Sequence, residues 1–201
     1  MRVAIHGLSQ AVANAVAEAF RADGHELGEP ADTAVVGVVG VEPPSGVDLL
    51  ELSHESWGAA VAGAREAFFA MQQAARSIVE QGEGGCLLVV VPVHALRTSR
   101  GCGPAAVVGS FLTTAAQVAA VELGAKGIRV NVLAVGPLEG EVDPRTADAV
   151  PLGRLTRPAD VGAACVMLAG PAAGYLSGAV VAVDGGYAVT KAVGGSPFAG
   201  A

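Results

Sequence analysis

The chain alternates between short apolar runs and longer segments in which apolar residues recur every three or four positions. The short runs are rich in Val, Leu and Ile, a pattern typical of strands buried on both faces of a sheet. They predict strands at residues 3–5, 34–41, 86–91, 128–135 and 179–183. The longer segments predict one helix that carries Val12, Val16 and Phe20 on one face, and further helices at 54–81, 103–124 and 159–169.

Strands that alternate with helices predict an α/β fold with a Rossmann-like, doubly wound parallel sheet. Ser53 stands where it can cap the helix at 54–81, and Pro158 stands at a favoured helix-start position. No linker or internal repeat interrupts the pattern. We therefore expect a single domain over residues 1–191, followed by a loose Gly- and Ala-rich tail at 192–201.

Composition narrows the class of protein. Apolar residues make up 52% of the 201 residues, charged residues only 15%, and the mean hydropathy is +0.51. This excludes a disordered chain, and it is more apolar material than one small core should need. With 12 Lys and Arg against 19 Asp and Glu, the net charge of −7 argues against nucleic acid or an anionic membrane surface as a partner.

One uncharged stretch, residues 103–121, is long enough to span a membrane. Polar residues dilute it, and Ala and Gly outnumber Leu, Ile and Phe, so we interpret it as a buried helix and expect no membrane partner. The N-terminus lacks the pattern of a signal peptide, and the three cysteines are widely spaced. We expect reduced cysteines, no metal site and a cytoplasmic location.

Four blocks in the second half carry a family resemblance. They read Gly127-Ile-Arg-Val-Asn131, Val150-Pro-Leu-Gly-Arg-Leu155, Arg157-Pro-Ala-Asp-Val161 and Val183-Asp-Gly-Gly-Tyr187. In this order and spacing they resemble the short-chain dehydrogenase/reductase family, in particular its ketoacyl-reductase-like branch. The first half fits more loosely, with Glu55-Ser-Trp57 placed as in the family's fourth helix. The resemblance implies the fold predicted above and a nicotinamide cofactor.

The family's catalytic groups are absent at the matching positions. The family uses a Tyr and a Lys four residues apart on a helix, a Ser on the preceding strand end and an Asn on the fourth helix. Family spacing places these at Ala105, Gly109, Pro92 and Ala64. None of these side chains can donate a proton, so the resemblance implies a catalytically inactive member.

The cofactor site also departs from the family pattern. The family's TGxxxGxG turn lets the backbone approach a pyrophosphate, whereas here only Gly7 remains and Ala11 and Ala13 replace the other glycines. Residues 25–33 have the composition of a turn and are too few for a βα pair. We therefore predict that the family's second and third strands and their helices are largely deleted. We expect no dinucleotide on this chain.

Several polar residues permit a functional interpretation, but a structural one is favoured for each. Asp184, Arg129 and Asn131 fit turn and framework roles. A solvated surface suits the acidic cluster of Glu139, Glu141 and Asp143, and a solvated loop suits His94, Thr98 and Ser99. A divergent oxidoreductase that uses His94 or Ser99 remains an alternative.

The apolar surplus suggests an association role. Residues 103–121 carry no charge and many small side chains, so their outward face would expose an apolar patch on a monomer. The resemblance implies pairing through helices 54–81 and 103–124 with an active family homologue. The chain is then similar to the non-catalytic subunits of heteromeric, often heterotetrameric, ketoreductases of β-keto thioester or antibiotic biosynthesis, with NADPH on the partner. A homodimeric module for a small apolar ligand remains a further alternative.

Overall fold

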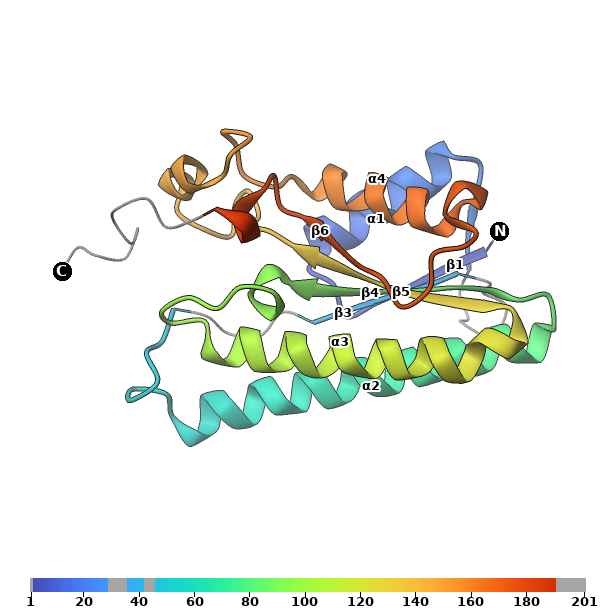
Figure 1. The fold of residues 1–201 in the computed structure, drawn as a ribbon, viewed down its shortest axis with the longest axis horizontal. Helices are drawn as coiled ribbons and strands as arrows, with labels where there is room; N and C mark the ends of the chain where they lie inside the picture. Colours follow the sequence, from blue (N-terminus) through green and yellow to red (C-terminus); the bar gives the residue numbers. More distant parts are fainter. Residues whose placement is uncertain (1, 29–35, 42–45, 191–201) are drawn as a thin grey trace.

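A six-stranded parallel sheet lies between two layers of helices (Figure 1). The structure, a computed structural model, describes residues 2–28, 36–41 and 46–190 of the chain. The strands are β1 (Arg2–His6), β2 (Glu26–Leu27), β3 (Val36–Gly40), β4 (Gly85–Pro92), β5 (Ile128–Val135) and β6 (Val180–Val183). The long helices are α1 (Gln10–Ala22), α2 (His54–Gln81), α3 (Gly103–Leu123) and α4 (Pro158–Ala169).

The sheet is doubly wound, as the pattern predicts. The strand order is β2-β1-β3-β4-β5-β6, and every neighbouring pair is parallel. The chain first moves from β1 to β2 on one side and then crosses back to β3 on the other side of β1. This reversal creates a switch point between β1 and β3, the place where open α/β sheets bind ligands.

The predicted truncation of the sheet is confirmed, although a short strand remains where the family's second strand was expected to be largely deleted. Within the segment interpreted as a turn, Glu26–Leu27 forms β2, which pairs with β1 at Arg2 and Val3. The backbone N–H of Gly28 extends this contact by donating to the carbonyl oxygen of Val3 at 3.1 Å. Two residues are too short to show any periodicity, which is why the pattern missed them. The described residues contain no strand beyond β2, so the sheet is still truncated on this side.

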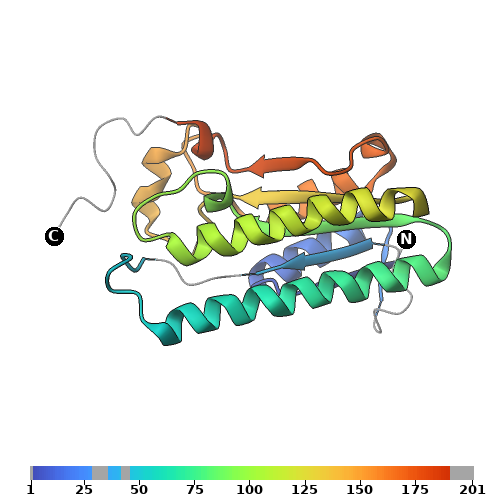
Figure 2. The same ribbon diagram turned by 60° about the horizontal axis from the view of Figure 1, so that its bottom comes forward.

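Two apolar cores flank the sheet (Figure 2). α2 and α3 cover one face, where Met71, Ile78 and Leu112 pack on β4 and β5. α1 and α4 cover the other face, where Phe20 and Leu168 are completely buried. The central strands β3, β4 and β5 read as continuous apolar runs because they are buried from both sides, whereas β6 at the sheet edge is only half-buried.

Local signals define the helix ends as predicted. The Ser53 hydroxyl accepts a hydrogen bond from the N–H of Ser56 at 3.1 Å, which caps α2. Pro158 occupies the first turn of α4. The predicted tail at residues 192–201 lies outside the described residues. The domain boundary at residue 191 therefore stays a prediction.

Candidate functional site

A cleft of about 340 Å³ opens at the carboxyl ends of the central strands. It lies beside the switch point between β1 and β3, with Leu8 from the turn after β1 and Val41 from the end of β3 on its wall. Pro92 at the end of β4 and Val135 at the end of β5 also line it. The cleft therefore occupies the position where this sheet topology favours ligand binding.

The structure brings together two of the four positions that match the family's catalytic groups. Ala105 at the start of α3 and Pro92 both line the cleft. Ala64 instead packs in the core between α2 and the sheet. Gly109 lies one turn beyond Ala105 on α3 and is buried, but it does not line the cleft.

Packing at Gly109 leaves no space for a longer side chain. The short 3₁₀ helix Val93–Ala95, which follows β4, lies against α3 at this position. A Cβ atom on residue 109 would lie 2.9 Å from the Cβ of Ala95 and 3.5 Å from the carbonyl oxygen of Pro92. The family's lysine position is therefore crowded by the Ala95 side chain of the neighbouring turn as well as lacking an amine.

The turn after β1 is shaped by its packing on β3. Gly7 has a φ of +69°, and a Cβ atom there would lie 2.4 Å from the carbonyl oxygen of Gly40. Glycine is thus needed for the turn itself. Ala11 and Ala13 follow in the first turns of α1, where the family has further glycines.

A carboxylate lies at the N-terminus of α1. The hydroxyl of Ser9, the N-cap residue of α1, donates to Oε1 of Glu141 at 3.1 Å. Glu141 comes from the loop after β5 and also lines the cleft. A helix N-terminus attracts negative charge, and in Rossmann folds a pyrophosphate takes this place. Here the chain places one of its own carboxylates there, which would repel a phosphate.

The cofactor that the resemblance implies fits these residues poorly. Alanine side chains replace two glycines of the phosphate turn, and the Glu141 carboxylate stands beside the helix N-terminus. The strand that would lead toward the adenosine ribose, β2, has only two residues. The first two features concern the pyrophosphate and the third concerns the adenosine ribose, and all three point in the same direction.

The charged groups and the imidazole around the cleft are bonded within the chain. Arg100 forms a bidentate pair with Asp48, and Asp143 forms one with Arg145. The Nδ1 atom of His94 lies 3.3 Å from the carbonyl oxygen of Arg97. Burial lowers the pKa of His94, so its ring is neutral at pH 7. Ser99, beside it, also lines the cleft.

The segment after β6 forms another part of the wall. Tyr187 lines the cleft, and Arg97 holds this segment from the loop after β4. The Arg97 guanidinium donates to the carbonyl oxygen of Tyr187 at 2.5 Å and to the hydroxyl of Thr190 at 2.7 Å. It also lies over the Tyr187 ring, 5.4 Å from the centroid. Arg97 and Tyr187 lie 90 residues apart, and no local pattern in the sequence links them.

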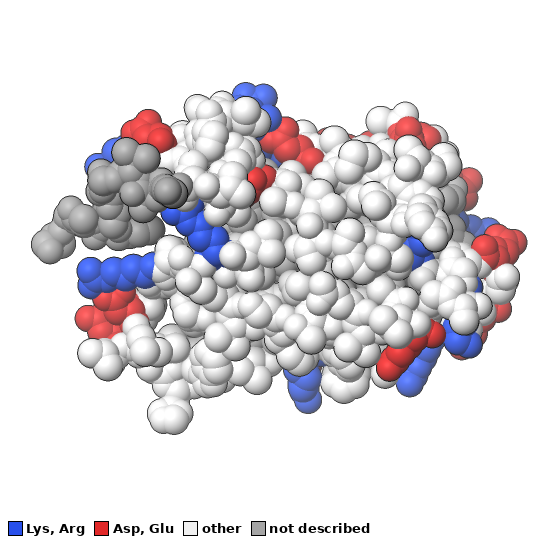
Figure 3. Space-filling model, in the orientation of Figure 1, with Lys and Arg blue, Asp and Glu red and all other residues white. Residues whose placement is uncertain are grey.

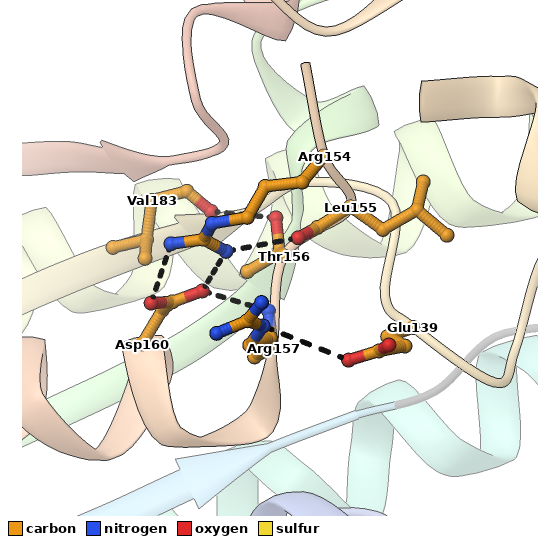
Figure 4. Close-up of polar contacts among 7 residues, drawn as sticks. All are labelled: Glu139, Arg154, Leu155, Thr156, Arg157, Asp160 and Val183. Atoms are coloured by element: carbon orange, nitrogen blue, oxygen red, sulfur yellow. Dashed lines mark hydrogen bonds and ion pairs between the residues drawn. The ribbon is translucent and has the colours of Figure 1, made fainter. Parts of the chain in front are cut away.

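Residues of the sequence blocks that suggest the family have structural roles here. Figure 4 shows Arg154 pairing with Asp160 through two hydrogen bonds, of 2.5 and 2.9 Å. Asp160 also accepts from the backbone N–H of Arg157 at 2.8 Å, which caps α4. Glu139 stands 3.9 Å from the Arg157 side chain. This network fixes the start of α4 and the loop after β5.

The framework interpretation of three further residues is confirmed. Arg129 donates to the carbonyl oxygens of Leu168 and Ala169 at the end of α4, at 2.8 and 2.9 Å. The Asn131 side chain is fully buried and joins β5 to the segment that leads into β6. Asp184 accepts from two backbone N–H groups of its own turn.

The outward side of α3 carries a row of exposed apolar residues and has no charge before Glu122. Val107, Phe111, Val118 and Val121 are between 48% and 83% exposed, and with the exposed Thr114 they follow one another at spacings of four, three, four and three residues. We call these five residues the α3 stripe. Figure 3 shows white, uncharged surface along α3. The opposite face of α3 packs on the sheet through Val108, Leu112 and Ala116.

This helix is also the one described segment that is long and apolar enough to cross a membrane, by length and composition. Only 28% of its most apolar window is buried. The expectation of a buried helix therefore holds for one of its faces only. The neighbouring α2 adds exposed Trp57, Val61 and Phe69 to the same layer.

Relatives found by sequence comparison are named reductases or dehydrogenases. The family profile described as Enoyl-(Acyl carrier protein) reductase matches residues 11–188. A probable 2,4-dienoyl-CoA reductase of Bacillus subtilis is 32% identical over 131 residues, covering 59% of this chain and 52% of that protein. An L-rhamnose 1-dehydrogenase of Azotobacter vinelandii is 34% identical over 130 residues, covering 60% and 51%. The chain spans about half the length of these curated relatives.

Solved structures show the same fold at low sequence identity. An oxidoreductase of the short-chain dehydrogenase/reductase family from Burkholderia thailandensis superposes with a TM-score of 0.84 at 19% identity, covering 96% of this chain and 94% of that one. Acetoin dehydrogenase YohF from Salmonella typhimurium gives a TM-score of 0.81 at 18% identity, covering 96% and 99%. The profile match spans most of the residues from α1 to the turn after β6. The chain belongs to the short-chain dehydrogenase/reductase family.

Proposed function

We propose that this chain is a non-catalytic member of the family that binds and stabilises a catalytically competent family chain. The observation that carries the proposal is the α3 stripe, an uncharged exposed surface on a helix that supplies no proton donor at Ala105 or Gly109. Exposed apolar surface of this kind marks association sites in proteins. The missing chemistry and the surface together indicate a supporting subunit.

The absence of a proton donor at the family's catalytic positions has a simple mechanistic consequence. Reduction of a carbonyl needs a group that protonates the developing oxyanion, and both cleft-lining positions, Pro92 and Ala105, offer only carbon atoms. His94 is neutral and its Nδ1 faces the Arg97 carbonyl oxygen, so its Nε2 is an acceptor and cannot donate a proton. Glu141, from the loop after β5, places a carboxylate beside the turn that would hold the cofactor. The reaction is therefore assigned to the partner, with NADPH bound there.

The α3 stripe suits an antiparallel helix pair. Spacings of four and three residues form the seam of a coiled coil. If two such helices cross at Thr114 about a twofold axis, Val107 faces Val121 and the large Phe111 faces the smaller Val118. A related chain with a similar helix could take the place of the second copy. Because two copies of this chain would hold no proton donor at the family's catalytic positions, a competent homologue is the partner that gives the assembly an activity.

The substrate class is proposed from the relatives. One relative is named a probable 2,4-dienoyl-CoA reductase, and another, from Canis lupus familiaris, a (3R)-3-hydroxyacyl-CoA dehydrogenase. Others are named for sugars, such as L-rhamnose. Together with the ketoacyl-reductase-like blocks, the acyl-CoA relatives support reduction of a β-keto thioester, in a fatty-acid-like or antibiotic pathway, by the partner.

Co-expression tests the association. The chain is expressed with family reductases encoded beside it, and the mass of the purified species is measured by light scattering. We expect a mixed assembly, which Phe111→Arg dissolves because it places a charge in the stripe. Met167→Arg, at an exposed position of α4 in the opposite helical layer, is the matched control and leaves the assembly intact. A chain that stays monomeric and binds none of the reductases, or that forms only homodimers, overturns the proposal.

Cofactor titration tests the non-catalytic part. We expect no heat change when the isolated chain is titrated with NADPH or NADH up to millimolar concentrations. Dissociation constants in the micromolar range would contradict the proposal and favour a divergent oxidoreductase that uses His94 or Ser99. Competence of the mixed assembly is measured separately, as NADPH oxidation with a β-keto thioester.

A further inference from the structure

The floor of the cleft is apolar. Its deepest walls come from the ends of β4 and β5 and from the start of α3, with Val90, Pro92, Ala105 and Val135 among the lining residues. Leu8 and Val12 close it from the side of α1. A volume of about 340 Å³ lies within the range of small-molecule sites, about 300–1,000 Å³. Since benzene occupies an engineered cavity of about 150 Å³, this volume suits a compound of roughly 14 non-hydrogen atoms.

The charged groups at the rim of the cleft are engaged within the chain and leave few partners for a charged ligand. Arg100 is paired with Asp48 and Asp143 with Arg145, while Glu141 accepts from Ser9. The neutral His94 ring is engaged with the Arg97 carbonyl oxygen, and the Cys102 thiol donates to the carbonyl oxygen of Ser99. An ionic ligand would have to break one of these internal contacts to gain its own, with no net increase in ion pairs.

Two other classes of occupant fit less well. A phosphate or carboxylate at the turn after β1 would meet the Glu141 carboxylate. An extended peptide would bring backbone N–H and C=O groups that need partners, and the rim groups named above are already bonded. An uncharged apolar compound needs neither, because its gain comes from burying carbon against the apolar floor.

We propose that the cleft between Leu8, Pro92, Ala105 and Val135 binds a small uncharged apolar molecule where catalytic relatives hold a dinucleotide. The segment at Tyr187, held by Arg97, forms one wall of this site. The chain would then act as a sensor or a carrier of such a compound, while its α3 stripe remains available for association. This inference goes beyond the supporting role and does not require it.

A series of three naphthalene compounds tests the proposal. They are 2-naphthylmethanol, 2-naphthoate and 2-naphthylmethylammonium, which share the ring system and differ in charge. Binding to the isolated chain is measured by saturation-transfer NMR and by amide shifts of the protein. We expect the alcohol to bind at least tenfold more tightly than the anion and at least as tightly as the cation. We also expect amide shifts near Val91–His94, Ala105 and Leu138.

A variant pair locates the site. Ala105→Leu fills the floor and should weaken the alcohol at least tenfold, whereas Ala163→Leu, at an exposed position of α4, should not change its binding. If Ala105→Leu fails to fold, the amide shifts of the unaltered chain decide the location. No binding of the alcohol, stronger binding of either ion, or shifts confined to the α3 stripe would each overturn the proposal. None of these results depends on whether a partner binds.

Discussion

At the scale of one residue, Gly109 departs from the family's active site in two ways. Its position lacks an amine, and Ala95 occupies space that a side chain at residue 109 would need. Restoring the family residues is therefore more than a change of two side chains.

We predict that Gly109→Lys lowers the free energy of unfolding by about 2 kcal/mol, because the new Cβ would lie within 3 Å of the Ala95 Cβ. Urea unfolding followed by circular dichroism measures the loss. Ala105→Tyr combined with Gly109→Lys should give no NADPH oxidation. Turnover by the double variant would show that the turn yields easily and that the cofactor still binds.

Asp160 gives a prediction that depends on pH. Hydrogen bonds from Arg154 hold the pKa of Asp160 below its ordinary value. A lowered pKa in the folded state stabilises the fold above pH 4, and this contribution is lost as the pH falls through the folded pKa. Asp160→Asn should cost about 1 kcal/mol at pH 7, since it weakens both the cap of α4 and a partly exposed ion pair.

The measurement is thermal unfolding from pH 7 to pH 3. The difference in melting temperature between the unaltered chain and Asp160→Asn should shrink as the pH falls below 4. Glu139→Gln serves as the control, because Glu139 contributes one contact of 3.9 Å to the same network. A difference that is constant with pH would rule out the ion pair as its source.

At the scale of elements, the contact between the loop after β4 and the segment after β6 sets the width of the cleft. Arg97 makes two hydrogen bonds and a ring contact to this segment. Arg97→Ala should free the chain after β6 and speed cleavage near Tyr187 by a protease of broad specificity. Arg21→Ala, at an exposed position of α1, is the control. Equal cleavage rates in the two variants would show that other contacts hold the segment.

The elements also show what the residue pattern could and could not predict. Apolar runs indicate β1, β3, β4, β5 and β6, and the runs are continuous in β3, β4 and β5 because these central strands are buried on both faces. Ser53 and Pro158 mark helix starts through local hydrogen bonding and backbone geometry. β2 was not predicted, because its two residues show no periodicity and only their pairing with β1 defines the strand.

The candidate site, like the fold, could be predicted from the sequence only in part. The positions of Pro92 and Ala105 at the cleft follow from family spacing and parallel topology. The contacts of Ser9 with Glu141 and of Arg97 with Tyr187 join residues that are 132 and 90 positions apart. Only the folded chain brings such pairs together, and the exposure of the α3 stripe likewise depends on which face of α3 the sheet covers.

For the whole molecule, the apolar surplus has a definite place. Part of it lies in strands covered on both faces, and part lies on the exposed surface of α2 and α3. Because the α3 stripe has no charges, the proposed association should be nearly independent of salt, with a dissociation constant that changes less than about threefold between 50 and 500 mM NaCl. Analytical ultracentrifugation of the assembly measures this. A steep loss of affinity with salt would assign the contact to the charged ends of the helices.

The spacing of the α3 stripe also has a geometric consequence. A repeat of four and three residues averages 3.5 per turn, whereas a straight helix has 3.6, so the stripe drifts slowly around α3 in a left-handed sense. A partner helix can follow it only by crossing α3 at about +20°, with the axes closest near Thr114. Thr114 at this point has a small side chain, and the partner helix needs a small side chain opposite it. The molecule thus specifies the angle at which its partner must approach.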